Sequence, residues 1–298
     1  MPNYILAIDQ GTTSTRAIVF DSMGSPVGSA QVELSQHFPQ PGWVEHDPIE
    51  IAEAAVSVAK QAIGRAKLGP EDIAAIGIAN QRETTIVWER RTGRPVANAI
   101  VWQDRRTAEI CRDIAKTDHA RSIRQITGLV IDPYFSATKL MWLLSTIPDG
   151  QARAQAGELC FGTVDSWLLW HLTDREVHAT DATNASRTML LNLHDLQWDP
   201  EMLELFDIPE VMLPQVKNTA DDFGVTSKKV FGAEIPITAM AGDQHAALYG
   251  QACFKNGQIK CTYGTGAFVL ANKGTTPPIP SFDGNDAGLV ATLGFRIG

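Results

Sequence analysis

Asp9-Gln10-Gly11-Thr12-Thr13-Ser14-Thr15-Arg16 is a polar turn between two strand-like runs, 4–9 (YILAID) and 16–21 (RAIVFD). The turn at 22–25 (SMGS) leads into a third strand-like run at 26–34. Turn residues between short runs of apolar and β-branched residues predict consecutive hairpins. We therefore expect the chain to open with three antiparallel strands.

The first turn also has the composition of a phosphate-binding site. Backbone N–H groups and hydroxyls converge on a tight hairpin turn, and Gly11 lets a ligand approach the backbone closely. We expect the hydroxyls of Thr12, Thr13 and Ser14 to donate to phosphate oxygens, and Arg16 to add positive charge. Asp9 is placed to hold magnesium through water. The alternative is a polar turn without a ligand, because hydroxyl-rich turns are common. No GxxxxGK[ST] sequence is present, which excludes a P-loop.

Helical and strand patterns alternate along the rest of the chain. Asp47 and Pro48 are a capping residue and a first-turn proline for a helix that runs to residue 66. An apolar run at 73–79 predicts a buried strand, and a second hairpin strand is expected at 84–89. Further segments predict helices at 104–116, 137–144, 164–172 and 200–206, and a strand at 235–241. The pattern indicates an α/β fold with a mixed sheet flanked by helices.

A second polar turn, 262–267 (TYGTGA), lies between strand-like runs at 258–261 and 268–271 and offers Thr265 as a further phosphate ligand. After a proline-rich loop from residue 272, the sequence stops within an apparent strand at 288–297. Domains seldom end on an unpaired strand, so we expect the chain to be a fragment. Two phosphate-type hairpins resemble the actin, Hsp70 and sugar-kinase superfamily, whose ribonuclease H-like domains each present a hairpin to the nucleotide phosphates.

Five separated motifs narrow the resemblance. In chain order they are 80–85 (NQRETT), 99–106 (AIVWQDRR), 128–136 (GLVIDPYFS), 183–188 (TNASRT) and 241–244 (AGDQ). Together with both turns they resemble the glycerol kinases of the FGGY carbohydrate kinase family over essentially the whole chain. The resemblance implies an N-terminal substrate-binding domain at 1–253, followed at 254–298 by the opening strands of a truncated nucleotide-binding domain.

Arg82 and Glu83 have the chemistry of a diol clamp. A guanidinium donates two parallel hydrogen bonds to neighbouring hydroxyls, and a carboxylate accepts from hydroxyl protons. Trp102 and Tyr134 are expected to wall the carbon side of the substrate. Without context, the charged pair is more often an exposed ion pair, and such aromatic residues more often belong to a core or a surface loop. The resemblance makes all four residues expected substrate contacts.

Asp243 follows the strand predicted at 235–241 and begins a helical stretch, which places its carboxylate at a cleft edge. On spacing alone it is more often a helix N-cap. The resemblance implies instead that Asp243 is the catalytic base, which orients the attacking hydroxyl and takes its proton late in phosphoryl transfer. It also implies that Gln244 holds another hydroxyl, and that Asp9 and Asp243 serve the metal.

The implied activity is ATP-dependent phosphorylation of glycerol to sn-glycerol 3-phosphate, with ATP and Mg²⁺ required and the isolated fragment inactive. Two alternatives stay open. One is a related kinase of a longer polyol or a ketose, in which the Arg-Glu pair would be absent. The other is an ATPase of the actin or Hsp70 type, which has no phosphoryl acceptor.

Composition narrows the partners. The formal net charge of −9 argues against nucleic acid, which needs clustered Lys and Arg. The apolar runs are shorter than the roughly 20 residues of a membrane span, and no export signal is visible, so we expect a cytoplasmic protein. The 4 cysteines and 7 histidines lack metal-ligand spacing. We expect the full-length enzyme to be a homo-oligomer.

Overall fold

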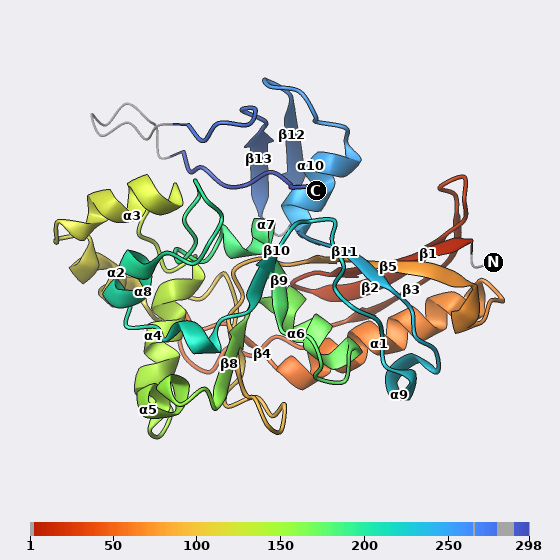
Figure 1. The fold of residues 1–298 in the computed structure, drawn as a ribbon, viewed down its shortest axis with the longest axis horizontal. Helices are drawn as coiled ribbons and strands as arrows, with labels where there is room; N and C mark the ends of the chain where they lie inside the picture. Colours follow the sequence, from red (N-terminus) through yellow and green to blue (C-terminus); the bar gives the residue numbers. More distant parts are fainter. Residues whose placement is uncertain (1–2, 265, 279–288, 298) are drawn as a thin grey trace.

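The largest sheet of the described structure has five strands in the order β11-β5-β1-β2-β3 (Figure 1). The computed structural model describes residues 3–264, 266–278 and 289–297. β1 and β3 are antiparallel to β2, whereas β5 is parallel to β1 and β11. The strands are β1 (Tyr4–Gln10), β2 (Ser14–Phe20), β3 (Pro26–Glu33), β5 (Ile73–Asn80) and β11 (Ile237–Gly242). The predicted antiparallel opening and mixed sheet are confirmed.

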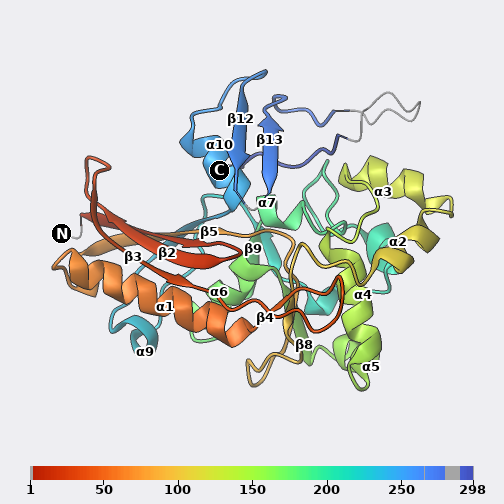
Figure 2. The ribbon, with the colours of Figure 1, turned by 180° about the vertical axis from the view of Figure 1, so that it is seen from behind.

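Helix α1 (Pro48–Arg65) covers one face of this sheet (Figure 2). Asp47 caps the helix by accepting a hydrogen bond from the Ile49 N–H at 2.8 Å, so the predicted start is confirmed. Apolar side chains recur every three or four positions of α1 and are buried beneath it. Leu6 and Ile8 of β1 are buried in the same core, while Asp9 alternates to the opposite, exposed face. One face of the sheet is therefore structural, and the other is free for chemistry.

Strand β6 (Ile86–Glu89) does not pair with β5, so the prediction of a hairpin between 73–79 and 84–89 is wrong. It pairs antiparallel with β8 (Leu159–Gly162). Ile86 and Trp88 belong to the core beneath α1, whereas Val87 belongs to a second hydrophobic core that includes side chains of α4 (Ser136–Thr146). Because its alternate side chains pack into two different cores, β6 lies outside the five-stranded sheet.

The other helices differ from prediction mainly in length. α6 (Val164–Leu172) has the predicted bounds, but the segment 104–116 is helical only at α2 (Ala108–Ile114). The Asp104 carboxylate instead accepts a hydrogen bond from Val44 N at 2.7 Å and binds Arg106. The remaining helices are α3 (His119–Thr127), α5 (Gly150–Gln155), α7 (Ala182–Ala185), α8 (Pro200–Leu205), α9 (Lys228–Phe231) and α10 (Asp243–Gly250), with 3-10 turns at Pro70–Asp72 and Glu210–Met212. The remaining short strands are β4 (Glu45–His46), β7 (Ala99–Ile100), β9 (Ala179–Asp181) and β10 (Gln215–Lys217).

The hairpin of β12 (Ile259–Tyr263) and β13 (Ala267–Ala271) is confirmed, and it stands beside α10 (Figure 1). The strand predicted at 288–297 is wrong for 289–297, where only an isolated bridge joins Ile297 to Ala220; residue 288 lies outside the described residues. The backbone hydrogen bonds of 289–297 go to separate segments, such as Ala291 N to Gly128 O, so no single strand pairs with it.

Among the residues that the structure describes, no helix combines the length and the apolar character that crossing a membrane requires.

Candidate active site

Three parallel strands bring the candidate residues to one edge of the sheet. β1, β5 and β11 end in register, with Gln10 opposite Asn80 and Asn80 opposite Gly242. Arg82 lies two residues after the end of β5, and Asp243 directly follows β11. The two residues are 161 positions apart in the sequence but meet at this edge. Ligands of open α/β sheets bind outside the carboxyl ends of parallel strands, and the predicted site lies there.

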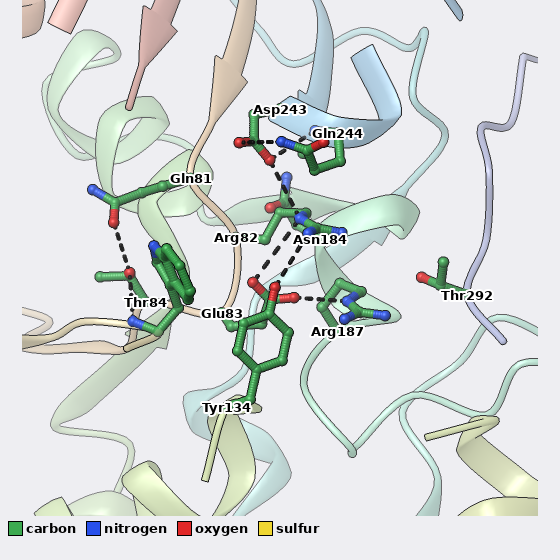
Figure 3. A network of polar contacts seen from close by, with 12 residues as sticks. Gln81, Arg82, Glu83, Thr84, Tyr134, Asn184, Arg187, Asp243, Gln244 and Thr292 are labelled. Carbon is green, nitrogen blue, oxygen red and sulfur yellow. Dashed lines mark hydrogen bonds and ion pairs between the residues drawn. The ribbon is translucent and has the colours of Figure 1, made fainter. Parts of the chain in front are cut away.

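Arg82 is the centre of the site, as Figure 3 shows. Its side chain is 4% exposed, and its Nε lies 3.3 Å from Asp243 Oδ1 and 3.9 Å from Glu83 Oε2. Its Nη2 donates a hydrogen bond of 3.2 Å to Tyr134 Oη. Four of the residues predicted to contact substrate are thus within one network of polar contacts. The guanidinium is held on two sides, which leaves it pre-organised for a ligand.

Glu83 is buried, and its backbone has a φ of 63°, a left-handed conformation that a non-glycine residue adopts at a cost. Its Oε1 accepts a hydrogen bond of 2.7 Å from Arg187 Nε, and its carbonyl accepts one from Ser136 Oγ at 3.0 Å. Sequence reasoning did not select Arg187 as a site residue, although it stands in the motif at 183–188. A buried carboxylate requires a charged partner, and Arg187 supplies one.

Aromatic side chains form a wall beside the clamp. The rings of Trp102 and Tyr134 meet edge to face with centroids 5.7 Å apart, and the ring of Phe268 lies 6.0 Å from that of Trp102. Phe268 comes from β13 and was also missed; its place directly after the second turn was the available signal. Burial raises the pKa of Tyr134 above its usual value, so its hydroxyl stays protonated.

The wall is tied to the first turn. Trp102 Nε1 donates a hydrogen bond of 2.8 Å to Thr12 Oγ1. The predicted substrate wall and the predicted phosphate turn are therefore in direct contact, across 90 positions of sequence. An open cavity of about 660 Å³ adjoins Trp102, Tyr134 and Arg187.

Asp243 is the first residue of α10, and Gly242 occupies the N-cap position. The N-cap alternative for Asp243 is therefore wrong. Its side chain is 34% exposed, and burial raises its pKa, while the nearby Arg82 guanidinium lowers it. Gln244 Nε2 donates a hydrogen bond of 3.0 Å to Asp243 Oδ2, and its own Oε1 is bound by the buried Nζ of Lys260. The carboxylate is fixed by two neighbours but reaches solvent.

The first turn has the predicted tight geometry. Gly11 N donates to Ser14 O at 2.9 Å, and a Cβ at Gly11 would lie only 3.1 Å from that oxygen. Arg16 Nε and Nη2 both bind Gln31 Oε1, at 3.0 and 2.7 Å, and Gln31 Nε2 donates to Ser14 Oγ at 3.1 Å. The turn is thus braced from β3 before any ligand binds.

Asp9 is paired in register with Arg16 on the face of the sheet away from α1. Burial by surrounding protein and the charge of Asp243 raise the pKa of Asp9, against a smaller lowering by Arg16. Two carboxylates therefore sense one another at the edge of the sheet. Of the other predicted phosphate ligands, Thr13 contributes its carbonyl to Leu34 N at 3.0 Å, and Thr265 lies outside the described residues.

Known proteins resemble this chain over nearly its whole length. A model of the N-terminal domain of the FGGY family of carbohydrate kinases matches residues 4–250. The glycerol kinase of Alcanivorax borkumensis is 54% identical over 294 residues, and glycerol kinase 2 of Thermotoga maritima is 55% identical over 294 residues. Each alignment covers 99% of this chain but 58% of the relative, so the chain spans less than two thirds of the relatives' length.

The solved structure of Plasmodium falciparum glycerol kinase with ADP superposes on the chain with a TM-score of 0.92 at 37% identity. The superposition covers 99% of this chain and 58% of that chain. The fold is thus the actin/Hsp70-like fold of sugar kinases, as predicted. With its sheet order, its two hairpin turns and a family match over residues 4–250, the chain belongs to the FGGY family of carbohydrate kinases.

Proposed function

We propose that the full-length protein transfers the γ-phosphoryl group of ATP to glycerol, giving sn-glycerol 3-phosphate and ADP. The observation that carries this proposal is the position of Arg82, held between Asp243 and Tyr134 and next to Glu83. A fork of donors beside two carboxylates suits a small molecule with neighbouring hydroxyl groups. The names of the Alcanivorax borkumensis and Thermotoga maritima relatives support glycerol as that molecule.

The residues then divide the work. Arg82 donates to two hydroxyl oxygens and Glu83 accepts from a hydroxyl proton, while Trp102 and Tyr134 cover the carbon chain and Gln244 holds another hydroxyl. Asp243 accepts the proton of the attacking hydroxyl as its oxygen bonds to the γ-phosphorus, and the bond to the ADP oxygen breaks. The raised pKa of Asp243 suits this role, because a stronger base accepts the proton more readily.

The first turn is proposed to hold MgATP. Thr12, Thr13, Ser14 and Arg16 would contact phosphate oxygens, with Thr265 on the second turn. Mg²⁺ is usually bound by one or two carboxylates together with water and substrate phosphates. Asp9 and Asp243 would hold the ion: burial and the charge of Asp243 raise the pKa of Asp9, and a bound cation would favour the ionised carboxylates. Mg²⁺ would neutralise charge on the transferred phosphoryl group.

The organisation of the protein belongs to the same proposal. Residues 1–253 would form the substrate-binding domain, and 254–298 the opening strands of the nucleotide-binding domain. The family match at 4–250 supports the first of these limits. We further infer a cytoplasmic homo-oligomer for the full-length enzyme, and a chain of 298 residues that binds glycerol without turning over ATP.

One assay separates the candidate functions. The full-length protein is given MgATP with glycerol, dihydroxyacetone, erythritol or xylulose, and ADP release is followed by a coupled enzyme. The proposal requires that ADP release depends on the acceptor and that kcat/KM is highest for glycerol. A higher value for xylulose or erythritol would indicate a kinase of another polyol or ketose, and acceptor-independent release would indicate an ATPase.

A further inference from the structure

A short buried segment, Asp181 to Arg187, contacts the site at three residues, Gly242, Asn80 and Glu83. Asp181, Thr183 and Asn184 have no exposed surface, and Arg187 is 4% exposed. Asn184 and Arg187 are seen beside the clamp in Figure 3. The proposed function gives Asp181, Thr183 and Asn184 no role in binding or catalysis.

The first contact is at the outer side of β11. Because β11 is an edge strand, its outward N–H groups need partners from outside the sheet. Met240 N donates to Thr219 O at 3.0 Å, and two residues later Gly242 N donates to Thr183 Oγ1 at 2.9 Å. A hydroxyl therefore holds the last outward N–H of the strand, directly before Asp243.

The Thr183 hydroxyl makes two hydrogen bonds, and their directions follow from its partners. A backbone N–H can only donate, so Thr183 Oγ1 accepts from Gly242 and donates its own proton to Asp181 Oδ1 at 2.9 Å. Asp181 accepts further bonds from Thr183 N, Asn184 N, Asn184 Nδ2 and Thr219 Oγ1, at 2.9 to 3.1 Å. Five donors and no acceptor surround this carboxylate in the described structure, which fits its ionised form.

Electrostatics acts on Asp181 in two directions. Burial and the charge of Asp165 outweigh the lowering effect of the hydrogen bonds from Asn184 and Thr183, so the pKa of Asp181 is raised to about 7. The donors thus offset part of the cost of burying the charge.

The second contact is at the end of β5. Asn80 Nδ2 donates to Asn184 Oδ1 at 2.9 Å, and Asn184 Nδ2 returns a bond to Asn80 Oδ1 at 3.0 Å. Asn80 Nδ2 also donates to Gln81 O at 2.8 Å, which fixes the peptide that precedes Arg82. The third contact is the bond of 2.7 Å from Arg187 to Glu83.

We propose that this segment positions the two halves of the site separately: Thr183, oriented by Asp181, positions Asp243, while Asn184 positions Arg82. The inference rests on the proposed glycerol kinase activity. Thr183 and Asn184 are positioning residues, because they act through Gly242 and Asn80 and touch no substrate. Each should therefore affect a different kinetic constant.

Thr183→Val keeps the shape of the side chain and removes the hydroxyl. In the full-length protein, kcat should fall about 10- to 100-fold, because a displaced base is costly, while KM for glycerol stays within about threefold. Thr183→Ser keeps the hydroxyl and should restore kcat to within about threefold of wild type. Asn184→Ala should show the reverse pattern, with KM for glycerol raised about tenfold or more and a smaller change in kcat.

Thr188→Val is the matched control. Thr188 is also buried, but within the described part of the chain its Oγ1 bonds only the nearby backbone, Ala185 O at 2.8 Å and Leu190 N at 3.1 Å. It should lower Tm about as much as Thr183→Val and leave kcat and KM within about twofold. Amide hydrogen exchange gives a readout without turnover: the Gly242 N–H should exchange faster in Thr183→Val and not in Thr188→Val.

The outcomes separate the two proposals. Wild-type protein without glycerol-dependent ADP release would overturn the proposed function, whereas the exchange measurement would still test the contact at Gly242. An active wild type with unchanged kcat in Thr183→Val would overturn the positioning role. Equal effects of Thr183→Val and Asn184→Ala on both kcat and KM would also overturn it, as would loss of kcat in Thr188→Val. If Thr183→Val does not fold, unchanged KM in Asn184→Ala refutes the separation.

Discussion

Gly242→Ala should damage the site through a single methyl group. A Cβ at Gly242 would lie 2.6 Å from Cγ and Cδ of Arg82 and 2.9 Å from Nδ1 of His245, whereas ordinary contacts begin at 3.4 Å. Gly242 has a φ of −58° and a ψ of 143°, which any residue adopts. The glycine is therefore required by the close approach of Arg82 and not by the backbone conformation.

The size of the effect follows from the distances. Arg82 has to move by about 0.8 Å, from 2.6 to 3.4 Å, and the contacts involve the middle of its side chain. The far end cannot follow freely, because Nε lies 3.3 Å from Asp243 and Nη2 binds Tyr134 at 3.2 Å. A displacement of about 1 Å at an active site costs about 10²-fold in rate, so kcat/KM for glycerol should fall by about two orders of magnitude, or about 2.7 kcal/mol.

Stability should change less than activity. Overpacking costs about 1 to 3 kcal/mol, and replacing a glycine at a permitted conformation returns about 0.4 to 1 kcal/mol. Gly250→Ala is the control, since Gly250 is the last residue of α10, the helix that Gly242 caps, and its Cβ would meet nothing within 4 Å. We expect it to leave kcat/KM unchanged. Coupled ADP release and thermal unfolding of both variants test the reasoning, and a Gly242→Ala enzyme within threefold of wild-type kcat/KM would refute it.

Three further predictions concern charge. Asp243→Asn should lower kcat about 10²- to 10⁴-fold with glycerol affinity within about tenfold, and near-normal kcat would remove it from the mechanism. Arg82→Ala should raise KM for glycerol, and the fall in kcat/KM should correspond to about 2 to 4 kcal/mol of lost binding. Arg82→Lys should restore little of it, and an unchanged KM for glycerol in Arg82→Ala would contradict the diol clamp. Burial lowers the pKa of His46 to about 4, so the unfolded chain binds a proton between pH 6.5 and 4 that the folded chain does not. The contribution of His46 alone should lower stability by roughly 3 kcal/mol as pH drops through that window, and burial lowers the pKa of His171 and His178 in the same way. His46→Gln should therefore reduce the slope of Tm against pH without abolishing it.

Local sequence was sufficient wherever an element's partners are its neighbours in the chain. The opening hairpins, the cap of α1 by Asp47 and the bounds of α6 all depend on contacts or patterns within a short stretch. The partner of β6 could not be predicted in this way, because β8 lies about 70 positions further on and is selected by two hydrophobic cores.

The site shows the same division. The chemistry of the Arg82–Glu83 pair and of Asp243 is readable from residue type and motif, but their contact requires the order of β5 and β11 in the sheet. Arg187 was missed because its function is to neutralise a buried carboxylate 104 positions away. Lys260, which binds Gln244, was missed because an alternating strand pattern gives no reason to bury a lysine.

The charges of the site are consistent with the different roles proposed for Asp243 and Glu83, which share Arg82. Glu83 is 1% exposed and bound at 2.7 Å by Arg187, so it has a cationic partner besides Arg82. Asp243 is 34% exposed, with Arg82 as its partner at 3.3 Å. Because Arg187 satisfies Glu83, the donors of Arg82 could serve the hydroxyls of the proposed substrate without leaving a buried carboxylate unpaired. Burial raises the pKa of Asp243, and Arg82 lowers it; if substrate hydroxyls took up part of the charge of Arg82, this lowering would weaken, which suits the base role proposed for Asp243.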